Sequence, residues 1–380
     1  MGALEVTFVC HTAQVGGAEL GLLRYLESHP PLRDRTLLLE DGPLADRLGE
    51  RAQVLRVRRP GSNRWAHLAR SLVALRRELR AGQGLVVATT LLSAVACALV
   101  APRRRPWVLY LQDGLRDGWL GPRKAAVIER LVLPRAAGYL VNSDWTRDQL
   151  PARERRKPVH VVYSPSGDHD AHAPRTDQRT VRVLSLSRLS PWKGQERLMD
   201  AVLEANSRPD APVTRLTIAG GTLFGEEEYA QRLYSHPLVA TGVVEFTGHV
   251  DDVAALLGAH DVLACPSTLP EPFGQVVVQG LRAGMAVLAT RLGGPAEIVV
   301  DGESGVLVGE STSAWADALS RVADPARRRQ IQEGAVRRAE VFADGAIARL
   351  TTDALRALAP TGVGPTPTST VNEDEGGPRA

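Results

Sequence analysis

The chain has few cysteines and few aromatic residues. Its 380 residues include three cysteines, Cys10, Cys97 and Cys265, and only 4% of its side chains are aromatic. The cysteines are odd in number, lie within apolar runs and lack metal-ligand spacing, so they favour buried thiols in a reducing compartment over a disulfide framework. The low aromatic content argues against an aromatic-rich β protein.

The sequence also lacks a long hydrophobic run. Its first residues do not show a basic segment followed by an apolar run and a cleavage site, so no secretion signal is predicted. The stretch Leu85 to Ala101 falls just short of a membrane span and contains Thr89, Thr90 and Ser93. We interpret it as a strand followed by a helix, and we expect a cytoplasmic protein.

Charge is unevenly divided along the chain. The net charge is +3, but residues 1–165 hold 26 Lys+Arg against 15 Asp+Glu. The densest clusters are Arg56, Arg58, Arg59 and the run Arg103 to Arg105. A basic N-terminal half suits an acidic acceptor or weak contact with a membrane surface, and the alternative is an ordinary solvated arginine-rich surface. We expect no nucleic-acid partner.

Short aliphatic runs alternate with amphipathic segments along most of the chain. This rhythm predicts parallel sheets covered by helices, and 380 residues exceed the usual size of a single core. The rhythm stops in the polar stretch from Ser164 to Arg179 and restarts at Val181. The predicted fold class is therefore α/β, with two Rossmann-like doubly wound domains that face a central cleft.

The predicted organisation has four parts. The N-terminal domain covers residues 1–165 and the C-terminal domain residues 166–342. A helix at 343–359 is expected to cross back to the N-terminal domain. Residues 360–380 are rich in Pro, Thr, Gly and acid, so we expect a disordered tail.

The most informative motif lies between Leu263 and Val308. A buried strand is followed by Glu271-Pro272-Phe273-Gly274-Gln275, and a second strand end carries Gly293-Gly294. A helix that starts near Phe273 to Gly274 would direct backbone amides toward an anion, and a nearby carboxylate can hold sugar hydroxyls.

With these motifs, the sequence resembles the retaining nucleotide-sugar glycosyltransferases of family four, which have the B-type fold. The resemblance extends from Gly16 to about Leu358 and is strongest in the C-terminal half. It implies that Glu271 contacts the donor sugar. The family has a second glutamate eight positions later, where this chain has Gln279, and the resemblance directs that position toward the donor ribose.

A second motif is the run from Ser187 to Gly194, which directly follows the first strand of the second domain. It matches the arginine and lysine of the family that grip the donor diphosphate, here Arg188 and Lys193. The chain has 43 arginines and only three lysines, Lys124, Lys157 and Lys193. Where arginine is so favoured, a lysine can mark a need for a compact point charge. Arg188, Lys193 and Glu271 are the predicted catalytic residues.

The resemblance also implies a set of donor-binding positions at loops after strands. Gly16 and Gly17 would lie over the donor phosphates from the first domain, although adjacent glycines alone are more often a plain turn. The loop at His249 would lie beside the base. The full predicted set is Gly16, Gly17, Gly220, Gly221, His249, Val250, Phe273, Gly274, Gln275 and Gln279.

Two further residues are expected on the acceptor side. The strand from Val108 to Leu111 is followed by Gln112 and Asp113, where many relatives carry a histidine before the aspartate. Gln112 is thus the second departure from the family pattern. The loop that continues to Trp119 and Arg123 either contacts the acceptor or is a solvated flexible loop.

The sequence predicts no metal site and no cofactor. Asp168-His169-Asp170 with His172 resembles a metal-binding triplet, but it lies in the linker rather than at a strand end within a domain. The resemblance implies transfer of a sugar, with retention, from a nucleotide-diphosphate donor. The arginine-rich, lysine-poor composition is typical of high-GC genomes, where such enzymes often act on small-molecule natural products or lipids, so one of these is the expected acceptor. A nucleotide-sugar epimerase and a non-catalytic sugar-nucleotide binding protein are the alternatives.

Overall fold

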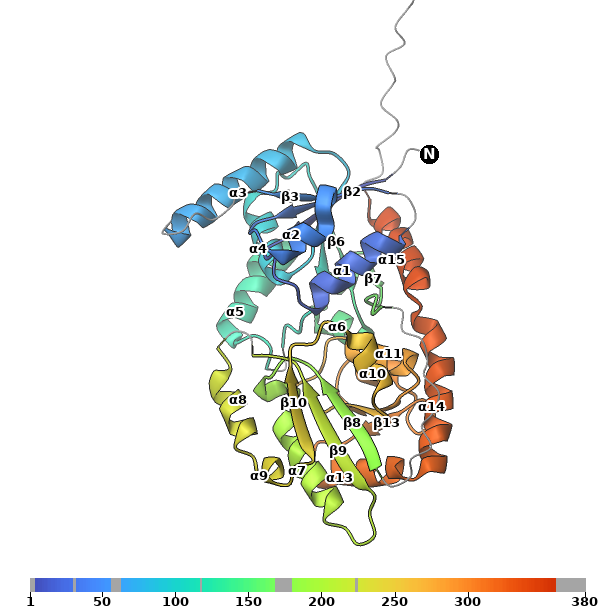
Figure 1. The fold of residues 1–380 in the computed structure, drawn as a ribbon. Helices are drawn as coiled ribbons and strands as arrows, with labels where there is room; N and C mark the ends of the chain where they lie inside the picture. The colour runs from blue at the N-terminus through green and yellow to red at the C-terminus, as the bar shows by residue number, and fades with distance from the viewer. Residues whose placement is uncertain are drawn as a thin grey trace, which may run out of the picture.

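The computed structural model describes residues 4–29, 32–55, 63–116, 118–167, 180–222 and 225–359. The chain forms two α/β domains, one above the other in Figure 1. The linker residues 168–179, with the Asp168 triplet, and the tail 360–380 lie outside the described residues, as do Arg56, Arg58 and Arg59.

The N-terminal domain contains a seven-stranded parallel sheet in the order β3-β2-β1-β4-β5-β6-β7. Its strands are β1 (Glu5–Cys10), β2 (Arg33–Leu38), β3 (Ala52–Val54), β4 (Leu85–Ala88), β5 (Trp107–Leu111), β6 (Gly138–Val141) and β7 (Val159–Val161). Strands β4 and β6 are buried at every position, as expected for parallel strands with helices on both faces.

The C-terminal domain contains a six-stranded parallel sheet in the order β10-β9-β8-β11-β12-β13. Its strands are β8 (Thr180–Leu186), β9 (Val213–Ala219), β10 (Val244–Gly248), β11 (Val262–Cys265), β12 (Ala286–Thr290) and β13 (Val306–Val308). Both sheets follow the doubly wound order, in which the chain reverses direction beside the first strand. The predicted fold class is confirmed.

Helices cover both faces of each sheet. In the N-terminal domain they are α1 (Gly17–Ser28), α2 (Pro43–Leu48), α3 (Arg64–Ala81), α4 (Leu91–Val100), α5 (Pro122–Val127), its π-helical continuation η2 (Ile128–Val132) and α6 (Asp144–Gln149). In the C-terminal half they are α7 (Gln195–Asn206), α8 (Glu227–Tyr234), α9 (Pro237–Ala240), α10 (Val253–Gly258), α11 (Gln275–Arg282), α12 (Pro295–Ile298), α13 (Thr312–Ala323), α14 (Pro325–Ala339) and α15 (Asp344–Leu358).

The apolar stretch near the middle of the N-terminal domain forms a strand and a helix, as the sequence predicts. The apolar stretch that begins at Leu85 forms β4 and α4, and Thr90 caps α4 by accepting a hydrogen bond from the Ser93 amide. None of the helices in the described part of the chain combines the length and apolar character that a membrane span requires.

The chain crosses between the domains twice. Strand β7 leads through the linker to β8, and α14 leads to α15. Helix α15 packs against α1, and Ala348, Ala354 and Leu355 belong to the same buried cluster as Leu22 and Leu26 of α1. In Figure 1 the red helices run along one side of the molecule and join the lower domain to the upper one.

Candidate active site

The main polar cluster lies where the C-terminal sheet reverses its strand order. Strands β8 and β11 are neighbours in the sheet, and their helical connections leave in opposite directions. In open α/β sheets, ligands bind at this switch point outside the carboxyl ends of the strands. The loop after β8 carries Lys193 and the loop after β11 carries Glu271.

Lys193 and Glu271 form a close ion pair across the switch point. The Lys193 Nζ donates to Glu271 Oε1 at 2.5 Å, and the Ser267 hydroxyl donates to the same oxygen at 2.6 Å. The two charged side chains are 15% and 7% exposed. The Lys193 ammonium also lies 3.9 Å from the ring centroid of Trp192, within range of a cation–π contact. An ammonium has three donors, so Lys193 has capacity beyond Glu271.

Arg188 lies in the same loop as Lys193. Its guanidinium carbon is 5.6 Å from the Trp192 ring, and its Nη1 is 3.7 Å from Glu226 Oε2. Glu226 also accepts from the Ser190 hydroxyl. The structure therefore places both predicted diphosphate-binding cations on one indole, each beside a carboxylate.

Glycines hold these loops close together. Gly293 has a φ of 77°, and a Cβ there would lie 2.2 Å from the Glu271 carbonyl oxygen, while one on Gly294 would lie 2.4 Å from that of Phe273. Only glycine tolerates both the left-handed backbone and the contact at position 293. The Gly294 amide donates to Glu271 O at 2.8 Å. These glycines thus position the backbone around Glu271.

Gly220 has the same role on the other side of the switch point. Its φ is 139°, and a Cβ would lie 2.1 Å from the Ser187 carbonyl oxygen. Its amide donates to Gly248 O at 2.7 Å, and Gly221 O accepts from the Leu189 amide at 2.9 Å. The ends of β8, β9 and β10 are thereby joined, and the predicted glycine pair lies beside the Arg188 loop.

Helix α11 begins at the boundary between the domains. Gly274 caps it in a left-handed conformation with φ 98°. The next side chain, Gln275, donates from Nε2 to the Gly17 carbonyl at 2.7 Å and accepts from Arg24 Nη1 at 3.3 Å. In the first domain, the Gly16 amide donates to Glu19 Oε2 at 3.2 Å. The two predicted phosphate loops therefore meet through Gln275.

Gln279 contacts the interdomain linker. Its Nε2 donates to the Ser166 carbonyl at 2.9 Å, and the side chain is buried. The Ser166 and Gly167 amides each donate to the Asp344 carboxylate at 3.0 Å. The amide at the family's second glutamate position thus holds the linker from the C-terminal domain, while Asp344 holds it from the start of α15.

Gln112, the other departure from the family pattern, contacts the linker from the opposite domain. Its Nε2 donates to the Thr89 carbonyl at 3.2 Å, and its Oε1 accepts from the Ser164 hydroxyl at 3.4 Å. Both glutamines are buried. Each therefore connects its own domain to the segment from Ser164 to Gly167.

Titratable groups gather at the switch point of the N-terminal sheet. His11 follows β1 and its Nδ1 lies 2.8 Å from Thr90 Oγ1, after the neighbouring strand β4. Burial lowers the pKa of His11, which favours the neutral imidazole. Burial raises the pKa of Asp113, and it also raises that of Glu19 against the hydrogen bonds that Glu19 receives.

Hydrogen bonds join the two domains around Glu271. The Ser143 hydroxyl donates to the Pro272 carbonyl at 2.5 Å. Glu297 accepts from the amides of Asp144 and Trp145 at 2.9 and 2.7 Å, at the start of α6. These bonds hold the loop that carries Glu271 against the N-terminal domain.

An aromatic contact crosses the interface beside this cluster. The indole N–H of Trp119 donates to the Pro270 carbonyl at 3.1 Å, and the rings of Trp119 and Trp192 lie edge to face with centroids 5.1 Å apart. Trp119 therefore lies in the interdomain site rather than in a free loop. Arg123 lies on the exposed surface at the start of α5.

Three predicted donor-binding side chains point elsewhere. Phe273 is 3% exposed and stacks on Tyr163, with ring centroids 5.4 Å apart, so its side chain belongs to the core. His249 is exposed and its Nε2 lies 3.4 Å from Asp251 Oδ1. Val250 packs against the core.

Within the described residues, no group of His, Cys, Asp and Glu side chains has the arrangement of a metal site. The Asp168 triplet lies outside them.

Sequence reasoning did not identify His11, Ser267, Glu297 or Asp344 as site residues. Ser267 and Glu297 lie inside the recognised C-terminal motif, so position within the motif was an available signal. His11 directly follows the first strand, where a switch-point residue is expected. Asp344 carried no comparable signal, because its partners are 177 and 178 residues away.

Family models match both domains. Residues 180–324 match the model described as "Glycosyl transferases group 1", and residues 3–167 match the "Glycosyl transferase 4-like domain".

Curated relatives share part of this chain. The "D-inositol 3-phosphate glycosyltransferase" of Corynebacterium glutamicum (strain R) is 32% identical over 261 residues, which cover 63% of this chain and 62% of the relative. The protein of the same name from Nocardioides sp. is 30% identical over 271 residues, which cover 64% of this chain and 59% of the relative. The chain thus matches about three fifths of the length of these relatives.

Solved structures share the whole fold. Anabaena HepE in complex with UDP and glucose superposes with a TM-score of 0.79 at 25% identity, over 93% of this chain and 100% of that one. The sucrose-phosphate synthase of Thermosynechococcus elongatus has a TM-score of 0.74 at 20% identity, over 93% and 99% of the two chains.

Proposed function

The chain belongs to the group 1, family-four glycosyltransferases with the B-type fold, and from that premise we propose that it transfers a sugar from a nucleoside diphosphate-sugar to an acceptor hydroxyl with retention of anomeric configuration. The observation that carries the proposal is the cluster of Arg188, Lys193 and Glu271 at the switch point of the C-terminal sheet.

In this proposal Arg188 and Lys193 bind the departing diphosphate. As the bond between the anomeric carbon and the diphosphate oxygen breaks, negative charge grows on the diphosphate, and Lys193 and Arg188 stabilise it. The acceptor oxygen forms the new bond to the anomeric carbon. Its proton passes to the departing diphosphate on the same face, so no carboxylate nucleophile and no metal ion is needed.

Glu271 has two tasks in this scheme. Its carboxylate orients Lys193 through Oε1 and can accept hydrogen bonds from sugar hydroxyls through Oε2. His11 and Asp113 lie on the opposite, N-terminal side, where the acceptor would bind. Gln112 and Gln279 hold the linker that joins the two domains. Closure of the domains over the donor would exclude water from it.

The first donor and acceptor to test follow from the similar proteins. HepE was solved with UDP and glucose, so UDP-glucose is the first donor to test. The curated relatives are named for D-inositol 3-phosphate, which makes it the first acceptor, ahead of the small-molecule and lipid acceptors that the sequence suggests.

The test is incubation of the purified chain with each donor, alone and with each acceptor, followed by mass spectrometry and NMR of the products. We expect a glycoside only when the acceptor is present, with the anomeric configuration of the donor. An epimerised nucleotide-sugar without acceptor would make the protein an epimerase. Donor binding with neither product would make it a non-catalytic binding protein, and an inverted glycoside would refute the proposed retention.

A further inference from the structure

Three helices cover one face of the N-terminal sheet. Helices α3, α4 and η2 pack side by side, and their inner residues Leu75, Cys97 and Val132 belong to one buried cluster. The opposite face is covered by α1, α2 and α15. In Figure 1, α3, α4 and α5 follow one another down the left edge of the upper domain. We call the outer side of α3, α4, α5 and η2 the helical face.

The helical face exposes large apolar side chains. The described residues include 14 exposed large hydrophobic side chains, and six of them lie on these helices. They are Leu68 and Val73 on α3, Leu92 and Leu99 on α4, Val127 on α5 and Leu131 on η2. Val73, Leu99 and Leu131 are 70%, 65% and 64% exposed. Single exposed leucines are ordinary, but a set on three adjacent helices indicates an interaction surface.

The same face is strongly basic. Helices α3, α4, α5 and η2 hold eight Lys+Arg and two Asp+Glu. Among the described side chains, the exposed cations on these helices are Arg70, Arg76, Arg77, Arg80, Arg123, Lys124 and Arg130. Arg76, Arg77 and Arg80 surround Val73 in a shallow hollow of about 430 Å³ on α3. With this arrangement the arginines can contact an anionic lipid headgroup while the apolar side chain contacts the acyl chain beneath it.

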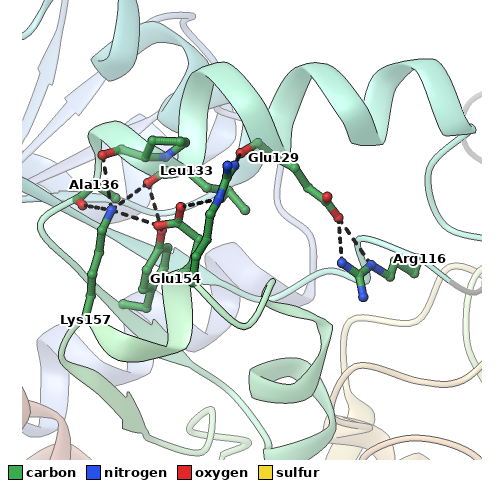
Figure 2. A network of polar contacts seen from close by, with 9 residues as sticks. Arg116, Glu129, Leu133, Ala136, Glu154 and Lys157 are labelled. Atoms are coloured by element: carbon green, nitrogen blue, oxygen red, sulfur yellow. Dashed lines mark hydrogen bonds and ion pairs between the residues drawn. The ribbon is translucent and has the colours of Figure 1, made fainter.

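The two acids on these helices, Glu78 and Glu129, each pair with an arginine that lies outside the helices. Glu78 lies 3.2 Å from Arg35 Nη1. The Glu129 carboxylate lies 3.0 Å from Arg116 Nη2, as Figure 2 shows. These pairings leave the cations of the helical face without matching negative charge on the same helices.

A buried network anchors the helix that borders the site. Lys157 Nζ lies 2.8 Å from Glu154 Oε2. It also donates to the carbonyls of Leu133 and Ala136, which follow η2 in the chain (Figure 2). Burial disfavours the Glu154 carboxylate, but hydrogen bonds from Lys157 and Tyr139 outweigh this and lower its pKa. The segment that directly follows η2 is thus attached to the buried carboxylate of Glu154 through Lys157.

We propose that the helical face binds the surface of an anionic lipid bilayer. The arginines would contact lipid phosphates, while Val73, Leu99 and Leu131 enter the boundary between headgroups and acyl chains. Interleaved apolar side chains favour a membrane over a nucleic acid, whose backbone offers only charge. Helix α5 begins three residues after Trp119, which lies at the interdomain site. Membrane binding therefore brings that site close to the lipid surface.

The experiment is co-sedimentation of the full chain with vesicles, in a comparison of pure phosphatidylcholine with a mixture containing phosphatidylglycerol. We expect binding to the anionic vesicles that weakens as salt is raised. Arg77→Glu and Arg80→Glu should each lower the affinity by at least about fivefold, since one cation near such a surface contributes about that much. Leu99→Ser should lower it without changing the salt dependence.

Matched controls lie on the other domain. Arg329 and Val336 are exposed on α14, so Arg329→Glu and Val336→Ser change similar side chains away from the helical face and should leave vesicle binding unchanged. Equal binding to neutral and anionic vesicles, or equal loss in the α14 controls, would overturn the proposal. Binding to duplex DNA without binding to vesicles would overturn it as well. The readout is binding, so the outcome does not depend on transferase activity.

Discussion

At the scale of single residues, the three lysines of this arginine-rich chain have distinct surroundings. Lys193 contacts one carboxylate oxygen and one indole face, and Lys157 contacts three backbone carbonyls and a carboxylate. A compact ammonium can fill such sites, whereas a planar guanidinium cannot direct its donors in the same way. Lys124 is exposed on α5. The rarity of lysine thus indicated constrained sites in two cases, one of them structural.

Lys193→Ala should reduce kcat/KM for the nucleotide-sugar by ten- to a hundredfold. It removes a charge-assisted contact of about 1.5 to 3 kcal/mol if that contact strengthens in the transition state. Lys193→Arg should recover only part of the loss. Steady-state kinetics measure both variants, with exposed Arg215→Ala in the same domain as the control. Unchanged kcat/KM in Lys193→Ala would place the diphosphate site elsewhere.

Gln279→Glu should weaken the attachment of the linker. The amide donates to the Ser166 carbonyl at 2.9 Å, and a carboxylate in its place has no hydrogen to donate and would face that oxygen with like charge. We expect a lower Tm and a higher KM for the donor, with a smaller change in kcat.

Gln279→Met separates lost hydrogen bonding from repulsion, since it removes the amide without adding charge. It should be milder than the glutamate variant in thermal denaturation. A Gln279→Glu protein that is as stable as the original and binds donor more tightly would favour direct ribose contact over the linker role.

Asp113→Asn should stabilise the protein at neutral and higher pH. Burial raises the pKa of Asp113 above its ordinary 3.8, so the folded state holds this proton more tightly than the unfolded state does. The ionised carboxylate therefore costs stability, and the cost grows as pH rises from the unfolded pKa to the folded pKa. The gain in Tm should be largest above the folded pKa of Asp113 and shrink as the pH falls toward its ordinary pKa of 3.8. A gain that is independent of pH would contradict this origin.

At the scale of elements, both chain crossings meet in one place. The linker after β7 and the start of α15 are joined by Asp344, which accepts from the Ser166 and Gly167 amides. Gln112 holds the same segment from β5 and Gln279 from α11. Any rotation of one domain against the other must act on this cluster.

Asp344→Ala should destabilise the protein by about 3 kcal/mol, because it leaves two amides without their charged acceptor. Asp353→Ala on the same helix removes only an exposed contact with Arg356 and should cost less than about 0.5 kcal/mol. Urea denaturation compares the two. Equal stability of both variants would show that the crossings are not coupled through Asp344.

At the scale of the whole molecule, the domains are held together by contacts around the candidate site. Ser143, Trp119 and Gln275 each reach the opposite domain by a hydrogen bond. Around the candidate site, the carboxylates of Glu271 and Glu226 each lie beside a cation, and the described residues form no cluster of acidic and histidine ligands for a metal ion. We therefore expect the cations of the protein, rather than a metal ion, to neutralise the charge of a bound diphosphate.

Transfer should therefore survive chelation. Activity measured in excess EDTA should equal that of the untreated protein, because Arg188 and Lys193 supply the positive charge. A complete loss that manganese restores would implicate the Asp168 triplet instead.

The sequence alone determined the two-domain α/β class and the motif residues. Parallel strands that are buried on both faces give continuous aliphatic runs, which the sequence shows directly. The motifs consist of a strand followed within a few residues by glycines and charged residues, so they too are visible in the sequence. The run around Glu271 and the loop with Lys193 were recognised because this local pattern resembles that of the family. The structure adds that Gly293 and Gly294 hold the backbone around Glu271.

Only the tertiary structure decided which partners these residues have. Lys193 and Glu271 are 78 residues apart and meet because β8 and β11 are neighbours in the sheet, while Gln279 reaches Ser166 across 113 residues. From its position in the motif, Gln279 was expected to contact the donor ribose. In the structure its side chain donates to the carbonyl of Ser166 in the linker. Strand order and domain packing set such contacts, and neither is encoded in the local pattern that a sequence displays.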